Sequence, residues 1–260
     1  MGYSYSDEDD YTSKELSAEY LHYLDSSKNS AVSLGASYQH NTAEIYCFMG
    51  TSVCDGVSGA SSKSVEKDID VINVELGYTQ VINKTSLVKA SIFAIHEEGF
   101  LTNPYMRVVR DYVASPRITE EKKPDTRNAV GITLEYTKSL SDVLSAIASY
   151  RYYHDDWDIT SHTLGIKLNY EMTEDLTLGM GFRAYTQSAA EFFSAKRDYF
   201  TTEEYASSDR RVSDFDALSY TVTLDYALSE KSSINASVGY YNQPDYFDAS
   251  YFNVGFKYKF

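Results

Sequence analysis

The sequence has little of what marks several common protein classes. It contains only four prolines and no low-complexity run, which argues against extended disorder. No stretch approaches the roughly 18 consecutive apolar residues that a membrane-spanning helix needs. The formal net charge of −15 leaves no basic face for a nucleic acid, so we expect no nucleic-acid partner. The first residues, MGYSYSDEDD, lack the basic and apolar regions of a signal peptide, so an exported chain would have lost its signal.

Cysteine and tryptophan are scarce, whereas tyrosine is abundant. The chain has 2 Cys and 1 Trp against 25 Tyr and 12 Phe, and only 43% of its residues are apolar. An aromatic-rich but polar chain suits strands that present one face to an apolar medium and the other to water. The two cysteines, Cys47 and Cys54, flank a polar segment that offers no core for free thiols. We therefore expect a disulfide between them, with two reduced thiols as the alternative.

Apolar and polar residues alternate along much of the chain. In the terminal segment SYFNVGFKYKF, every second residue from Phe252 to Phe260 is apolar or aromatic, and the residues between them are polar or glycine. The same period of two occurs in SINASVGYY, ALSYTVTLDYAL, LTLGMGFRAY and HTLGIKLNYEM. This period predicts β-strands with one apolar face. A soluble β-sandwich would show it too, so alternation alone does not decide the fold.

The lengths of the connections between the predicted strands distinguish a β-barrel from a β-sandwich. Short polar turns such as MTED and SEKSS alternate with longer segments at roughly 43 to 69, 98 to 127 and 188 to 215. Outer-membrane barrels show this asymmetry between short periplasmic turns and long outer loops. We therefore predict an all-β fold, namely a transmembrane antiparallel β-barrel with an up-and-down meander, in contact with the lipid of the bacterial outer membrane.

We expect residues 1–260 to form a single barrel domain of 12 strands, in which the last strand pairs with the first and closes the ring. Both ends of the chain then lie on the short-turn rim. The predicted strands span about 2–8, 14–25, 30–41, 70–81, 85–97, 128–138, 144–155, 162–172, 176–187, 216–228, 232–242 and 250–260.

Several segments resemble a known protein family. These are TNPYMRVVRDY, SYRYYHDDWDITSHTLGI, RAYTQSAAEFF, SSDRRVSDFDALSYTV and the terminal YFNVGFKYKF, within roughly residues 100 to 260. They resemble the outer-membrane proteins grouped as domain-of-unknown-function family 3570. The resemblance implies an outer-membrane β-barrel without an established activity and supplies no catalytic residues. Members tend to be encoded near small lipoproteins and flavin-transfer or thioredoxin-like proteins, which implies a small lipoprotein or a periplasmic redox protein as a candidate partner.

Charged residues on the polar face of the predicted strands are candidates for lining the barrel lumen. They are Glu75, Lys89, Glu135, Arg151, Lys167, Glu171, Arg183, Asp225, Lys257 and Lys259. Because their signs are nearly balanced, they suit either a selectivity lining or a ladder of ion pairs that fills the lumen. Opposite charges in a confined lumen tend to pair, so we favour the ion-pair ladder.

Histidines give a weaker candidate for a site. His40, His96, His154 and His162 fall near the long-loop rim, and His154 and His162 are predicted to face each other across HDDWDITSH. Aspartates nearby would suit a metal ion, but no close multi-histidine spacing exists, so we expect no metal and no other cofactor.

Motifs of catalysis are missing as well, and the chain is therefore not expected to be an enzyme. The sequence contains no nucleophile elbow, paired-carboxylate motif or Gly-rich phosphate loop. The function that remains is a passive pore or channel for small polar solutes. The alternative is a structural barrel that holds a lipoprotein or redox partner.

Overall fold

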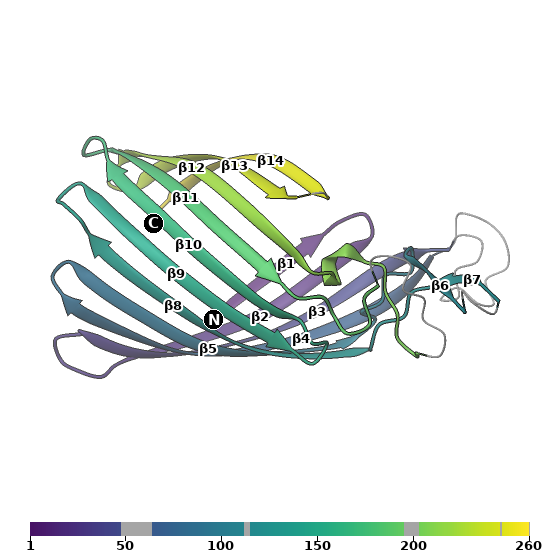
Figure 1. Cartoon of the computed structure of the whole chain (residues 1–260). Coiled ribbons are helices and arrows are strands. Elements are labelled where there is room, and N and C mark those ends of the chain that lie inside the picture. Colours follow the sequence, from purple (N-terminus) through teal and green to yellow (C-terminus); the bar gives the residue numbers. More distant parts are fainter. Residues whose placement is uncertain (48–63, 112–114, 195–202, 245, 260) are drawn as a thin grey trace.

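A computed structural model describes residues 1–47, 64–111, 115–194, 203–244 and 246–259. Twelve strands form one antiparallel sheet, in which each strand is hydrogen-bonded to its neighbours in the order β1-β2-β3-β4-β5-β8-β9-β10-β11-β12-β13-β14 (Figure 1). A separate hairpin consists of β6 and β7. Within the described ranges, no helix is long and apolar enough to cross a membrane.

The strands of the main sheet are β1 (Gly2–Asp7), β2 (Tyr11–Tyr23), β3 (Ser30–Tyr46), β4 (Ser64–Asn83), β5 (Ser86–Gly99), β8 (Thr126–Ser139), β9 (Leu144–Asp155), β10 (Thr160–Glu171), β11 (Leu176–Gln187), β12 (Phe215–Ser229), β13 (Ser232–Gln243) and β14 (Phe247–Tyr258). The hairpin strands are β6 (Arg107–Arg110) and β7 (Arg117–Glu120). The predicted all-β meander of 12 strands is therefore confirmed.

The long connections differ from the prediction in two places. Residues 43–46 and 64–69 were expected in a loop, but β3 and β4 remain paired as far as Tyr46 and Ser64. Beyond the pair His40 and Asp70 the outer face of this hairpin becomes polar, so the alternation stops although the backbone pairing continues. The hairpin of β6 and β7 lies within the segment expected to be a loop at 98–127.

The two faces of the sheet differ in polarity and in exposure. Large apolar side chains on one face are exposed, as Ile92 is at 55%, whereas the next residue on the opposite face, Phe93, is only 7% exposed. Side chains on the concave side of a rolled sheet converge and cover one another, so the second face is the inner one. The hydroxyl of Tyr251, which reaches across Gly239 and lies 3.0 Å from Thr221 Oγ1, shows this crowding. The apolar face is therefore convex and faces lipid.

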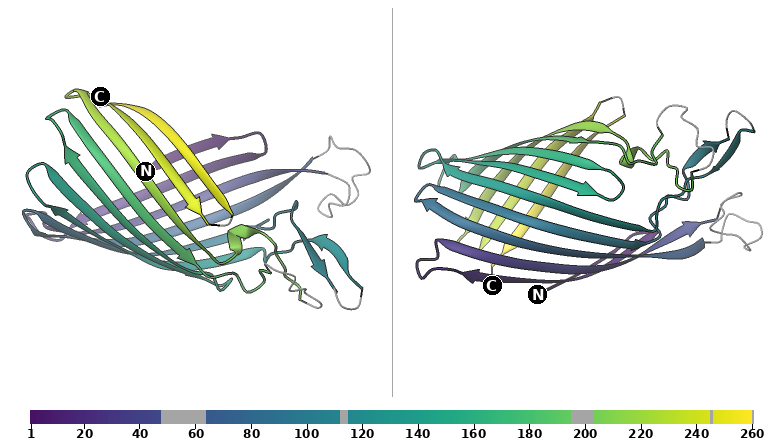
Figure 2. Two further views of the ribbon diagram at one scale, coloured as in Figure 1. Left: turned by 45° about the horizontal axis from the view of Figure 1, so that its top comes forward. Right: turned by 60° about the horizontal axis from the view of Figure 1, so that its bottom comes forward.

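The expected pairing of the last strand with the first is not observed among the described residues. β1 and β14 are the two ends of the sheet order, and Figure 2 shows them as separate edges of the rolled sheet. β1 has 6 residues and β14 has 12, so β1 offers only half the length of backbone for such a pairing. Phe260 and Cys54 lie outside the described residues. Cys47 is buried, and its disulfide with Cys54 stays a prediction.

Candidate functional site

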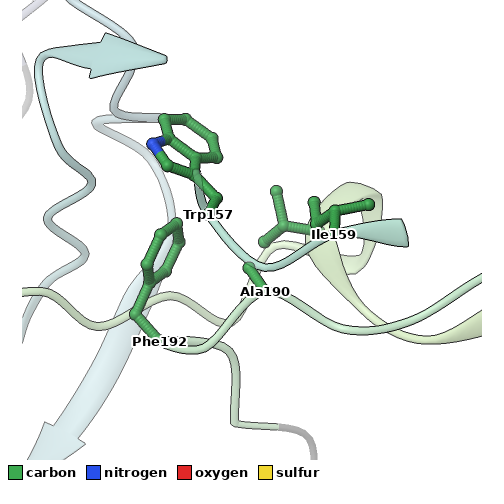
Figure 3. Packing of buried hydrophobic residues seen from close by; sticks show 5 residues of the cluster. Trp157, Ile159, Ala190 and Phe192 are labelled. Carbon is green, nitrogen blue, oxygen red and sulfur yellow. The ribbon is translucent and has the colours of Figure 1, made fainter. Parts of the chain in front are cut away.

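A compact apolar cluster lies at the long-loop rim of the sheet. Its buried residues come from the turn between β9 and β10 and from the connection between β11 and β12. They are Trp157, Ile159, Ala190, Phe192 and Val212, the rim cluster (Figure 3). The rings of Trp157 and Phe192 meet edge to face with centroids 5.2 Å apart. A packed core outside the strands gives these connections a defined structure at the rim.

Asp155, the last residue of β9, organises the turn that carries Trp157. Its buried carboxylate accepts hydrogen bonds from the backbone N–H groups of Trp157 (3.0 Å) and Ile159 (2.9 Å). Arg127 donates to it from Nε (2.8 Å) and Nη2 (2.6 Å), and the Tyr153 hydroxyl donates over 2.9 Å. The Arg127 guanidinium also lies 4.7 Å from the Trp157 ring centroid. A buried carboxylate needs such donors because water does not solvate its charge.

A second network, buried except for the Arg211 side chain, joins two connections that are distant in sequence. Its members are Glu121, Lys123, Ser207, Asp209 and Arg211, the loop lock. Lys123 Nζ lies 3.2 Å from Glu121 Oε1 and 2.8 Å from Asp209 Oδ2. Ser207 donates to Glu121 Oε2 over 2.6 Å, and Arg211 donates to Asp209 from Nε (3.0 Å) and Nη2 (2.7 Å). The lock ties the connection between β5 and β8 to the connection between β11 and β12.

The charges within the loop lock compensate one another. It contains two carboxylates and two cations, and Glu121, Lys123 and Asp209 are all buried. Burial alone would raise the pKa of Asp209, but hydrogen bonds from Arg211 and Lys123 lower it below its ordinary value. Because each carboxylate is already paired with a cation, the lock serves to hold the loops and leaves no bare charge for a ligand.

Four of the five segments that resemble the family meet at this rim, whereas the terminal YFNVGFKYKF lies mostly in β14. TNPY contributes Asn103, whose N–H donates to Glu121 Oε1 over 2.7 Å. HDDWDIT contributes Asp155, AAEFF contributes Phe192 and SSDRRV contributes Asp209. Periodicity did not single out these residues, because Asn103, Phe192 and Asp209 lie in loops and Asp155 is the polar last residue of β9. The available signal was the resemblance itself, together with the single tryptophan of the chain.

The two candidate metal-binding histidines do not face each other. His154 lies opposite Thr160, and His162 lies opposite Tyr152, because the turn of β9 and β10 sets this register. His154 Nδ1 is 3.0 Å from Thr160 Oγ1, and His162 Nδ1 is 2.7 Å from the Tyr150 hydroxyl. In the part of the chain that the structure describes, no three His, Cys, Asp or Glu side chains gather in a metal-binding arrangement.

The other two rim histidines also lie on the outer face. His40 Nδ1 is 2.9 Å from Asp70 Oδ1, and His96 Nδ1 is 2.7 Å from Asn128 Oδ1. Each pair follows the last large apolar residues of its strands, such as Ile72 on β4. The four rim histidines thus mark the level at which the apolar band ends, where polar and aromatic residues meet the membrane surface.

The lumen candidates lie on the concave face of the sheet. Glu75 is on β4, Lys89 on β5, Glu135 on β8, Arg151 on β9, Lys167 and Glu171 on β10, Arg183 on β11, Asp225 on β12 and Lys257 on β14, and Lys259 follows β14. Lys89 and Glu135 lie opposite each other, with Nζ and Oε1 3.6 Å apart. No other ion pair joins two members of this set within the described residues. The predicted ladder of ion pairs is therefore reduced to one pair.

Two arginines of this set contact aromatic rings. Arg151 lies 4.3 Å from the ring centroid of Phe93, and Arg183 lies 5.1 Å from that of Tyr185. Such contacts leave the guanidinium charged. The concave face therefore carries charges that are not neutralised by a neighbouring side chain of opposite sign.

Comparison with known proteins identifies the fold. The family described as "Protein of unknown function (DUF3570)" matches residues 1–251, so the likeness also covers the first hundred residues. A search of curated proteins found no match. The toluene transporter TodX of P. putida is similar in structure, with a TM-score of 0.56 and 12% identity over 96% of this chain and 72% of TodX.

Two further solved structures show the same architecture. A FadL homologue of Pseudomonas aeruginosa has a TM-score of 0.50 and 13% identity over 90% of this chain and 60% of its own. The ferric-catecholate import receptor Fiu of E. coli K12 has a TM-score of 0.50 and 9% identity over 95% of this chain and 49% of its own. The fold is that of the bacterial outer-membrane β-barrels, and the apolar convex face fits that location.

Proposed function

The chain belongs to the DUF3570 family, and we propose that this member is a passive channel for small polar solutes in the outer membrane. The observation that carries the proposal is the polar concave face. Along the wall of β2 to β4 this face borders a hollow of about 500 Å³, lined by small polar residues such as Ser17, Ser33 and Ser37 and by Glu75. Hydroxyl and charged groups at a lumen surface replace part of the hydration shell of a passing solute.

The rim cluster and the loop lock support a channel of constant shape. Together they connect three segments of the outer rim through buried contacts, for example Trp157 with Phe192 and Lys123 with Asp209. Packed and charge-paired loops move less than loops with few buried contacts. We therefore expect the outer mouth to stay in one state, as a passive channel requires.

Single-channel conductance in planar bilayers tests the proposal. The purified protein is expected to give steady open steps. Replacing Ser37 by Trp places a large side chain in the hollow and is expected to reduce the step size, because Ser37 is on the concave face. Leu34→Trp is the matched control, since Leu34 lies on the convex face of the same strand and is 50% exposed there. Equal effects of the two variants would contradict a lumen on the concave side.

The alternative is a structural barrel that holds a small lipoprotein or a periplasmic redox protein. Its support is the resemblance to a family whose members tend to be encoded near such proteins. Bilayers without conductance steps, together with a lipoprotein or redox protein that co-purifies in fixed ratio, would favour this alternative. No residue is assigned a catalytic role under either proposal.

A further inference from the structure

We infer that the lumen holds an electric field across its width. This field favours small zwitterions over solutes of the same size that carry no charged groups. This inference rests on the proposed channel function. It follows from the distribution of unpaired charges over the concave face, where carboxylates and cations gather on different strands.

One wall of the lumen is acidic. Glu15 and Glu19 lie on β2 and Glu75 lies on β4, all near the middle of their strands. Glu19 and Glu75 both lie opposite Gly35 of β3, so no side chain separates them. No ion pair joins these three carboxylates to a Lys or Arg among the residues that the structure describes. The wall of β2 to β4 therefore presents negative charge above a surface of small side chains.

The other wall is basic. Arg151, Lys167 and Arg183 lie in the middle of β9, β10 and β11. Arg183 lies opposite Gly165 and Lys167 lies opposite Gly181, so between β10 and β11 no side chain stands directly opposite either cation. The described residues contain no carboxylate in an ion pair with any of the three. Positive charge is thus concentrated on this wall.

The rolled sheet places these two walls across the lumen from each other. β5 and β8 separate them in the sheet order, and in Figure 1 β9 to β11 form the front of the molecule while β2 to β4 lie behind them. Lys89 and Glu135, on the strands between the walls, are paired with each other. The remaining concave charges lie toward the strand ends or just beyond them, namely Lys67, Glu97, Arg127, Asp155, Glu171, Asp225, Lys257 and Lys259.

Two facing walls of opposite charge act differently on a zwitterion and on an uncharged solute. A zwitterion gains by turning its ammonium group toward the acidic wall and its carboxylate toward the basic wall. An uncharged solute of the same size gains little. A lumen with walls of low dielectric constant weakens the field less than bulk water does. The arrangement therefore selects for the dipole of the solute and not for its net charge.

Liposome swelling with a pair of isomers tests the inference. β-Alanine is a zwitterion and lactamide carries no charged group, and the two have the same molecular formula. Liposomes that contain the protein are expected to swell about threefold faster in β-alanine than in lactamide. Swelling in neither solute would contradict the proposed channel and the inference together. Equal swelling in both would contradict the inference and leave the channel standing.

Three variants separate the field from the net charge of the lumen. In bi-ionic potential measurements, Glu75→Gln is expected to shift ion selectivity toward anions and Lys167→Gln toward cations. The double variant, which combines Glu75→Gln with Lys167→Gln, removes one charge of each sign. Its ion selectivity is therefore expected to return to that of the wild type. Its preference for β-alanine is nevertheless expected to be the weakest of the series, because both walls have lost charge.

The control variant is Glu174→Gln, which removes a carboxylate from an exposed short turn outside the lumen. It is expected to change neither the swelling ratio nor the ion selectivity. Heat-dependent gel migration of every variant shows whether it is folded. A folded double variant that keeps the wild-type preference for β-alanine would overturn the inference.

Discussion

At the scale of single residues, Asp155 is expected to determine the stability of the rim cluster. Asp155→Asn keeps a side chain of the same shape but leaves the Arg127 guanidinium without its 2.6 Å partner. Removing one partner of a buried ion pair typically costs about 3 kcal/mol. The chain has one tryptophan, Trp157, so its fluorescence during urea titration reports the rim cluster directly. We expect a lower transition midpoint for this variant.

Asp158→Asn is the matched control for this measurement. Asp158 lies in the same turn and is exposed, and its backbone φ of 68° suits asparagine as well as aspartate. The control is expected to unfold within about 0.5 kcal/mol of the wild type. A similar loss in both variants would mean that charge in the turn, and not the buried pair of Asp155 and Arg127, stabilises the cluster.

Asp209 is expected to make the loop lock sensitive to acid. The pKa of its carboxyl is lowered in the folded protein, so the unfolded chain takes up this proton first, near its ordinary pKa of about 4. The stabilisation by Asp209 is therefore complete above that pH and is lost as the pH falls from there toward the lower folded pKa. Val212 belongs to the rim cluster, so Trp157 fluorescence also follows this change.

The variant Asp209→Asn tests this assignment. It is expected to have lower stability than the wild type at neutral pH and to show a smaller further loss between pH 4 and more acidic conditions. Urea titrations at several pH values, read by Trp157 fluorescence, give both quantities. An unchanged pH profile would assign the acid sensitivity to another carboxyl group.

At the scale of the elements, the period of two predicted the strands well because the membrane imposes it. Each span needs an apolar face toward lipid and tolerates polar groups inside, so alternation reveals both the strand and its orientation. The same rule fails above the membrane, where the outer face of β3 and β4 is polar from His40 and Asp70 onward. The hairpin of β6 and β7 was missed because its strands, RVVR and RITE, show no period of two.

Local sequence patterns could not predict the rim cluster or the loop lock. Lys123 and Asp209 are 86 residues apart in sequence, and a charged residue in a loop resembles any solvated one until its partner is known. The lumen charges were predicted as a set with a ladder of ion pairs between them, but the described residues contain only the pair of Lys89 and Glu135 within this set. Whether two inward charges meet depends on the strand register, which places Lys89 opposite Glu135 but Glu75 opposite Phe93.

The orientation of β12 has a direct test. Val222 is 43% exposed on the convex face, and Thr223 lies on the concave face. An arginine in place of Val222 is expected to destabilise the barrel by roughly 2 to 4 kcal/mol, because its charge enters the lipid near mid-membrane. Thr223→Arg places the same charge in a polar lumen and is expected to cost less. Folding titrations of both variants into lipid vesicles measure the difference.

Lipid quenching provides the control for this test, because a soluble sandwich would also be destabilised by an arginine at Val222. A tryptophan in place of Val222 is expected to be quenched strongly by brominated lipid, and one in place of Thr223 weakly. Trp157 is first replaced by Phe in both proteins to remove its own signal, since it is the one tryptophan of the chain. Equal quenching would mean that the assignment of the two faces is wrong.

At the scale of the whole molecule, the two sheet edges determine how the barrel behaves in detergent. β1 and β14 are not hydrogen-bonded to each other among the described residues. In the hydrocarbon region each unpaired backbone N–H and C=O group costs several kcal/mol, so edges at membrane depth are unfavourable in lipid. We therefore expect the two edges to meet in the membrane-embedded protein, as closure of the ring requires.

Gel migration before and after boiling tests this closure. A closed barrel stays folded in mild detergent, because the pairing of every strand must be lost before any strand can leave. The unboiled protein is therefore expected to migrate at a different position from the boiled one. Val222→Arg should show the change at a lower temperature than Thr223→Arg, since only the first variant weakens the lipid-facing side. Identical migration of boiled and unboiled wild-type protein would contradict a closed ring and favour a sheet with two free edges.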